Sequence, residues 1–232
     1  MAGIFGSLIL TAIIGYVWGS LPAGYWLGKI MRGKNFDIRD YGSHKIGATN
    51  VLRTLGPVAA AIAFIFDISK GIGPTLLATL VPGLHGAGWG PAIAGITALL
   101  GHCFPVFIGF KGGRGVMTAG GALLIISPLA FAITAVFTLG TIAIWRYVSL
   151  GSVTGAATAI VCGIIFFIIG LFDPTFFAKV SLPQLVFIVV APGLVIIFHH
   201  DNIGRLLNGT ERKLGQKEAI PASNETTSNA KA

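Results

Sequence analysis

Long apolar runs without a charged side chain constrain this sequence more than any other feature. The first charged residue is Lys29, and only 10% of the 232 residues are charged, while 54% are hydrophobic. Soluble domains carry about 25% charged residues, and a membrane-spanning helix needs ~20 apolar residues. We therefore predict an all-α, polytopic integral membrane protein. The run before Lys29 lacks the basic start and the cleavage site of a signal peptide, so it is predicted to be a retained first span.

Seven membrane helices account for the apolar runs and for the charges between them. The predicted spans are 4–28, 56–82, 90–110, 115–126, 129–145, 149–171 and 184–200. The uncharged stretch 116–145 is divided because Pro128 disfavours helix at the residue before it. With seven spans, every lysine and arginine except Lys70 and Lys179 falls on one side of the membrane, and such an excess marks the cytoplasmic side. The N-terminus is therefore predicted to lie outside and the C-terminus inside.

The chain is predicted to form one membrane-embedded domain, residues 1–214. The polar tail 215–232 lacks aromatic side chains and is expected to be disordered. Cys103 and Cys162 lie in apolar sequence, where they are expected to be buried. Asp67 and Lys70, inside the second span, are expected to form a structural ion pair, although an intramembrane charged pair is a functional hypothesis by default. Glycines spaced by four, as in 151–155, predict close packing of helices.

Most of the remaining hydrophilic chemistry falls in three stretches at the ends of apolar runs. The first, residues 37–53, combines Ser43, Thr49, Asn50 and Arg53 with glycines. Glycines let a loop turn its N–H groups inward around an anion, and arginine offers a bidentate fork to phosphate. A basic loop that only touches lipid headgroups would have a similar composition. Composition alone leaves these two interpretations nearly equal.

The second stretch also combines cations with glycines, and it lies directly before a predicted helix. FKGGRG at 110–115 places Lys111 and Arg114 around Gly112 and Gly113. Free N–H groups at a helix start favour an anion, whereas interfacial anchoring by two long cations is the simpler alternative.

The third stretch, residues 199–211, contains His199, Asn202 and Arg205, and the first two can share one face of a helix. Arg146, Ser149 and Ser152 open the sixth span from the same side. The three stretches together predict a phosphate-handling pocket at the cytoplasmic face. No metal site is expected, because the five histidines form no ligand pattern.

These motifs resemble the bacterial PlsY-type glycerol-3-phosphate acyltransferases. The resemblance is carried by GSLPAGY at 19–25, the stretch 37–53, GHCFPVF-x-x-FKGG at 101–113, RYVSLGS at 146–152 and H-x-x-N-I-x-R-L-x-x-G-x-E at 199–211. It implies a seven-helix enzyme of the bacterial inner membrane with its active site on the cytoplasmic face. A fatty acyl group would pass from acyl phosphate to the 1-hydroxyl of glycerol 3-phosphate, without a cofactor. The products would be lysophosphatidic acid and phosphate, in the first step of phospholipid synthesis.

The resemblance also implies roles for individual residues. Catalytic roles are expected for His199, Asn202, Ser43 and Arg53. Substrate binding is expected for a larger set: Thr49, Asn50, Lys111, Gly112, Gly113, Arg114, Arg146, Ser149, Ser152 and Arg205. The chain departs from the family pattern at two places. It has His44-Lys45 where the family usually has Gly-Asn, and GGRGVMT where the family usually has GGKGVAT.

Several alternatives stay open from the sequence. The proton of the 1-hydroxyl would pass either to His199 or to a substrate phosphate oxygen, and acyl-CoA or acyl carrier protein could replace acyl phosphate as donor. The expected partners are the two substrates and membrane lipids, with no nucleic acid. The His-x-x-x-x-Asp pair of other glycerolipid acyltransferases is absent. The competing function is a transporter of a small organic phosphate, whose site would lie near the membrane midplane between repeats; the sequence shows no convincing repeat.

Overall fold

The computed structural model describes residues 2–216, and every regular element in that range is a helix. The longer helices are α1 (Ala2–Gly19), α4 (Pro57–Leu80), α6 (Trp89–Cys103), α8 (Pro128–Trp145), α9 (Val148–Phe172) and α10 (Leu182–Ile197). The shorter ones are α2 (Ala23–Arg32), α3 (Ala48–Thr54), α5 (Pro82–His85), α7 (Val116–Ile126) and α11 (His200–Leu207). Three 3₁₀ turns complete the list: η1 (Ile38–Asp40), η2 (Gly86–Gly88) and η3 (Val106–Ile108). The predicted tail from 217 onward lies outside the described residues.

Five segments are long and apolar enough to cross a membrane: Gly3–Arg32, Pro57–Leu80, Pro82–Ile108, Pro128–Trp145 and Val148–Phe172. Helices α10 and α11, bent by 56° at their junction, form a sixth if they are taken together. Helix α7 has 11 residues, about 16 Å of helix, which is shorter than the ~30 Å hydrocarbon core. The prediction of an all-helical, multi-pass membrane protein is confirmed, and the count of seven spans stays a prediction.

Two of the apolar runs are broken into separate helices, and a proline lies at each break. Helix α7 ends at Ile126 and α8 begins at Pro128, so the predicted break at Ser127 is confirmed. The first run, expected to be one helix over 4–28, is also divided: α1 ends at Gly19 and α2 begins after Pro22. Proline disfavours helix at the residue before it. Helix α2 is amphipathic and carries Lys29 in its last turn.

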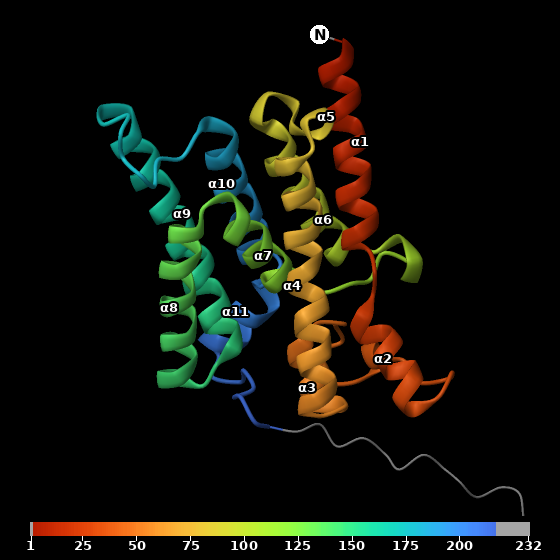
Figure 1. Ribbon diagram of the computed structural model, residues 1–232. Coiled ribbons are helices and arrows are strands. Elements are labelled where there is room, and N and C mark those ends of the chain that lie inside the picture. The colour runs from red at the N-terminus through yellow and green to blue at the C-terminus, as the bar shows by residue number, and fades with distance from the viewer. Residues whose placement is uncertain (1, 217–232) are drawn as a thin grey trace, which may run out of the picture.

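Small residues set how closely the helices approach. Gly15 and Gly19 of α1 face Ala94 and Ala98 of α6, and a methyl group at either glycine would collide with the α6 backbone. Gly151 likewise abuts Thr138 and Ile142 of α8. The close packing predicted from the glycine spacing is confirmed. Figure 1 shows the result, with α7 lying between α8 and α4 in the middle of the bundle.

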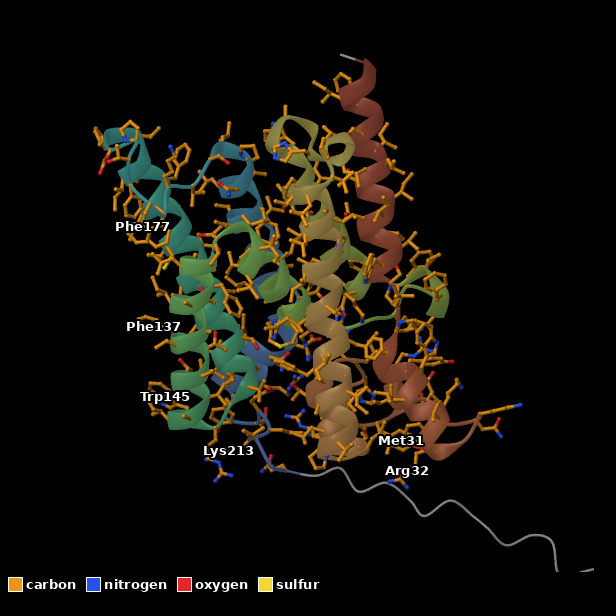
Figure 2. All side chains as sticks on the ribbon, viewed as in Figure 1. Met31, Arg32, Phe137, Trp145, Phe177 and Lys213 are labelled. Carbon is orange, nitrogen blue, oxygen red and sulfur yellow. The ribbon has the colours of Figure 1, made fainter. Side chains whose placement is uncertain are left out.

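The outer surface is apolar and the charges gather toward one end. Phe137 and Phe177 are 57% and 85% exposed, and Figure 2 shows both pointing away from the bundle. Arg32 and Lys213, although well apart from each other, both lie at the end opposite the N-terminal end of α1 (Figures 1 and 2). A surface of this kind suits contact with lipid tails, with the cations at the headgroup level.

Candidate active site

The three motif stretches meet around one cavity of about 250 Å³, the main cavity. It lies between α3, α4, α7, α8 and α9 and the junction of α10 with α11. Nine of the residues singled out from the sequence line it: Ser43, Thr49, Asn50, Arg53, Arg114, Ser149, Ser152, His199 and Asn202. Residues up to 159 positions apart thus converge, as the clustering of hydrophilic chemistry predicted.

The main cavity also has an apolar lining. Phe64 comes from α4, Met117 from α7, and Leu139 and Ile142 from α8. Apolar side chains of this kind bind hydrocarbon, whereas the arginines bind anions. The combination fits an amphiphile with an anionic head and an acyl chain.

Asn50 organises the loop of the first motif. Its side chain is 1% exposed. Its Oδ1 accepts a hydrogen bond from the Ser43 N–H at 2.9 Å, and its Nδ2 donates to the carbonyls of Ile38, Tyr41 and Lys45 at 3.1, 3.1 and 2.8 Å. Because these bonds occupy its donors, Asn50 positions Ser43 rather than offering its own amide to a ligand.

The backbone of the second motif is pinned to the end of α6. The N–H of Gly112 donates to the Cys103 carbonyl and that of Gly113 to the His102 carbonyl, both at 3.1 Å. A methyl group on Gly113 would overlap the His102 imidazole. Gly115 has a φ of +76°, which glycine adopts without a steric cost. These glycines bring the loop close enough to α6 to turn Arg114 into the main cavity.

Arg114 and Asn202 each present a buried polar atom without a hydrogen-bond partner among the described residues. These atoms are Arg114 Nε and Asn202 Oδ1. Burial lowers the pKa of Arg114, and the nearby Arg205 lowers it further. A guanidinium nevertheless stays protonated in proteins. Buried polar atoms are nearly always paired, so a donor and an acceptor left open beside a cavity indicate a polar ligand.

His199 is held in a defined tautomer at the start of α11. Its side chain is buried, and its Nδ1 lies 2.7 Å from the Val195 carbonyl. A carbonyl can only accept, so Nδ1 carries a proton. In the neutral ring Nε2 is therefore an acceptor, which is the state a general base requires.

Glu211 is the residue that sequence reasoning missed. Its Oε1 accepts from the Ser149 hydroxyl and from Asn202 Nδ2, and its Oε2 accepts from Arg205 Nε, each at 2.7 Å. Burial alone would raise the pKa of Glu211, but these three hydrogen bonds outweigh it and hold the pKa below its usual value. Glu211 closes the third motif and was quoted within it, yet only the fold shows that it ties α9 to α11.

The Asp67–Lys70 ion pair and the His102 ring form a buried polar cluster beside the main cavity. The Lys70 ammonium lies 2.6 Å from Asp67 Oδ1, and His102 Nδ1 lies 3.5 Å from the same oxygen. The predicted ion pair is confirmed. Asp67 itself lines the main cavity, as does His102, whose ring packs on Gly113.

Five predicted site residues do not line the main cavity: Lys111, Gly112, Gly113, Arg146 and Arg205. Lys111 is exposed and, with Gly112, lines a second cavity. Arg146 is exposed and donates to the Leu214 carbonyl, and Arg205 is engaged by Glu211. Within residues 2–216, no three His, Cys, Asp or Glu side chains gather in a way that could hold a metal ion. Both cysteines are buried, as predicted.

Comparisons with known proteins identify the family of this chain. Residues 9–209 match the family model of glycerol-3-phosphate acyltransferase. A glycerol-3-phosphate acyltransferase of Thermoanaerobacter sp. (strain X514) is 41% identical over 91% of this chain and 98% of its own length. One of Streptococcus gordonii is 38% identical over 88% and 91%.

Solved structures show the same likeness. The crystal structure of PlsY (YgiH), an integral membrane glycerol 3-phosphate acyltransferase, in its glycerol 3-phosphate form has a TM-score of 0.76 and 35% identity. The match covers 90% of this chain and 96% of that one. Its lysophosphatidic acid form gives 0.73 and 33%. The chain therefore belongs to the glycerol-3-phosphate acyltransferase family and is a membrane-embedded acyltransferase of phospholipid synthesis.

Proposed function

We propose that this protein transfers a fatty acyl group from acyl phosphate to the 1-hydroxyl of glycerol 3-phosphate. The observation that carries the proposal is the main cavity, in which Arg53, Arg114, His199 and Asn202 share one space with an apolar lining from α4, α7 and α8. One substrate is a small dianion, and the other joins a phosphate to a hydrocarbon chain. The related structures are described as glycerol 3-phosphate and lysophosphatidic acid forms, which supports this choice of acceptor and product.

The reaction needs positioning and charge stabilisation more than a new nucleophile. The 1-hydroxyl oxygen attacks the acyl carbonyl carbon, the bond from that carbon to the phosphate oxygen breaks, and orthophosphate leaves with the electron pair. Acyl phosphate is already activated, so holding two substrates in contact and stabilising the developing oxyanion supply most of the rate. Arg53 and Arg114 are the cations placed to bind the two phosphates. The Ser149 hydroxyl donates to Glu211 and is not set up as a nucleophile.

His199 and Asn202 act on the acceptor. The Nε2 of His199 accepts the hydroxyl proton, or it orients the hydroxyl while a substrate phosphate oxygen takes that proton. The open Oδ1 of Asn202 accepts a hydrogen bond from a glycerol hydroxyl. Its amide is held by Glu211 at 2.7 Å, so the oxygen points in a fixed direction. Ser43 and Thr49, which also line the main cavity, add hydroxyl donors.

The membrane arrangement follows from the charge distribution. We infer seven crossings with α7 as a short one, the N-terminus outside, and the site on the cytoplasmic face of the bacterial inner membrane. Residues 1–214 form the single functional domain. A site at that boundary lets a water-soluble acceptor meet a donor dissolved in the membrane.

The test is phosphate release by the purified protein in detergent, given palmitoyl phosphate with and without glycerol 3-phosphate. Release that requires the acceptor and yields lysophosphatidic acid supports the proposal. No release with palmitoyl phosphate, but turnover with palmitoyl-CoA or palmitoyl carrier protein, would replace the donor. Inactivity with all three would overturn the catalytic proposal in favour of transport, because detergent-solubilised protein has no sealed compartment across which to move a solute.

A further inference from the structure

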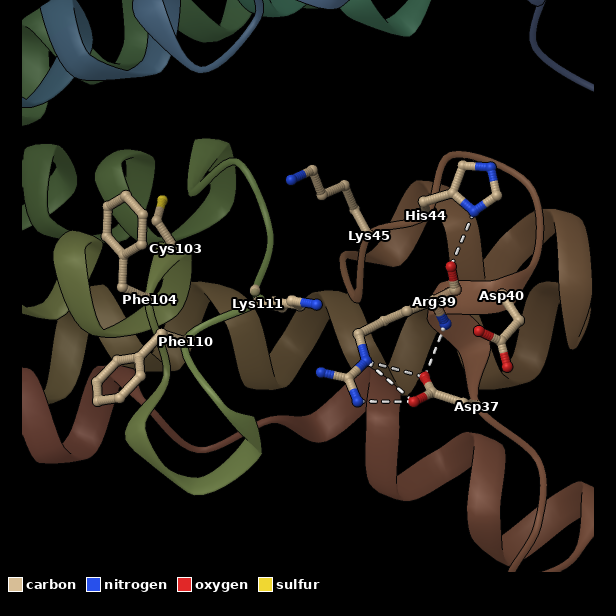
Figure 3. A pocket seen from close by; sticks show the side chains of 10 residues that line it. Asp37, Arg39, Asp40, His44, Lys45, Cys103, Phe104, Phe110 and Lys111 are labelled. Atoms are coloured by element: carbon tan, nitrogen blue, oxygen red, sulfur yellow. Dashed lines mark hydrogen bonds and ion pairs between the residues drawn. The ribbon is translucent and has the colours of Figure 1, made fainter.

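A second cavity, of about 490 Å³, shares one lining residue, Lys45, with the main cavity. It is lined by polar and charged side chains of the first motif loop, among them Asp37, Arg39 and Lys45, and by Lys111 from the second motif. Phe104 and Phe110 form its apolar side. Figure 3 shows Lys45 and Lys111 extending from separate loops into this space. The proposed reaction uses none of this cavity.

Lys45 is the one lysine or arginine that lines both cavities within the described part of the chain. Its backbone is fixed, because the Lys45 carbonyl accepts from Asn50 Nδ2 at 2.8 Å. The preceding His44 has a φ of +55°, a left-handed conformation that favours glycine. Its ring, with Nδ1 2.8 Å from the Arg39 carbonyl, helps to hold that strained turn. The chain thus holds a left-handed turn at His44 and places a cation, Lys45, directly after it.

Two of the cations that line the second cavity are not paired with a carboxylate. Arg39 is bound to the Asp37 carboxylate at 2.6 Å and donates to the Ile108 carbonyl at 2.8 Å. Among residues 2–216, by contrast, the ammonium groups of Lys45 and Lys111 have no hydrogen-bond or ion-pair partner. Asp40, the remaining carboxylate of the lining, is exposed. Two ammonium groups that line one cavity, neither of them paired with a carboxylate, bind a dianion more readily than a neutral ligand.

We propose that the second cavity is a separate phosphate-binding subsite, formed by Lys45 and Lys111, and that Lys45 links it to the main cavity. The ligand is a phosphate dianion: either orthophosphate or the phosphate monoester of the acceptor. The subsite rests on the proposed function for its role, because that reaction consumes one such dianion and releases another. A dianion held there lies next to the catalytic space without occupying it.

The experiment is equilibrium binding of radiolabelled orthophosphate to the purified full-length protein in detergent, without acyl donor. We expect two classes of site. Lys45→Asn and Lys111→Gln weaken one class about tenfold, the effect of removing one charged donor, while Arg114→Gln weakens the other. Lys45→Arg keeps both classes. Lys34→Gln is the matched control, since Lys34 is an exposed lysine of the same region outside both cavities.

Competition identifies the source of the dianion. Displacement of the Lys45-dependent class by unlabelled glycerol 3-phosphate assigns it to the phosphate monoester, and failure of displacement assigns it to orthophosphate. A single class of site, or a Lys45→Asn variant that binds as the parent does or loses both classes equally, would overturn the subsite. Turnover is measured separately, so loss of acyl transfer with two intact classes would refute the reaction and leave the subsite standing.

Discussion

The buried pair of Asp67 and Lys70 makes a quantitative prediction. Their side chains are 4% and 1% exposed, and the ammonium lies 2.6 Å from the carboxylate. Lys70→Met removes one charge and leaves the other buried. Breaking a buried pair by removing one partner costs about 3–5 kcal/mol, because the remaining charge is uncompensated. His102, 3.5 Å from the same carboxylate oxygen, is too far to replace the lost bond without moving.

Removing both charges should cost much less than removing one. In Asp67→Asn/Lys70→Met no charge stays buried, so we expect the double variant to regain about 2 kcal/mol or more over Lys70→Met. The assay is reversible unfolding in mixed micelles with increasing dodecyl sulfate, followed by circular dichroism. Ser69→Ala is the control: the Ser69 hydroxyl donates an exposed hydrogen bond to the Phe66 carbonyl of the same helix, and the change should be near neutral.

Two outcomes would refute this reasoning. Additive free-energy changes, with the double variant as unstable as the sum of the single ones, would show that the two charges do not stabilise each other. A stable Lys70→Met protein without acyl transfer would show that the pair serves catalysis rather than structure.

Three further predictions concern the loops around the main cavity. Gly113→Ala should reduce kcat/KM about a hundredfold, because its methyl group displaces the His102 ring and shifts the loop that carries Arg114. Gly140→Ala, in open space, should not; near-normal kinetics of Gly113→Ala would contradict the packing. Arg114→Lys, which keeps the charge, should retain more activity than Arg114→Gln, as steady-state kinetics with both substrates will show; equal losses would mean that the charge is irrelevant. Ionised Glu211, whose pKa is held below its usual 4.5, contributes stability that is complete above about pH 4.5 and is lost as the pH falls through the lowered pKa. Glu211→Gln should therefore be less stable than the parent at pH 7, with a gap that narrows in acid; a constant gap in melting temperature from pH 7 to pH 4 would exclude this linkage.

Much of the fold could be predicted from the sequence because the bilayer imposes simple local rules. The uncharged runs predicted the helices, and Pro128 predicted the break between α7 and α8. The break before α2 was missed although Pro22 carries the same signal, because the run 4–28 fits a single span, whereas the uncharged stretch 116–145 is too long for one. Helix α7 also shows that an apolar segment between two predicted breaks does not have to be long enough to cross the whole membrane.

The candidate site was predictable in composition but less so in arrangement. The motifs converge because their loops share one end of the bundle, so Ser43, Arg114 and His199 meet. The role of Glu211 depends on a turn after α11 that places its carboxylate against α9, which no local pattern encodes. Lys111 precedes Arg114 by only three residues, yet the intervening glycines send the two side chains into different cavities.

The most direct test of the proposed reaction follows the oxygen of the acceptor. Glycerol 3-phosphate labelled with ¹⁸O in its 1-hydroxyl is incubated with palmitoyl phosphate and the purified protein, and both products are analysed by mass spectrometry. Attack of that hydroxyl on the acyl carbon predicts that the label stays in the ester of lysophosphatidic acid and that the released phosphate is unlabelled. Phosphate release without a labelled ester would show that water, not the acceptor, takes the acyl group, and would contradict the account.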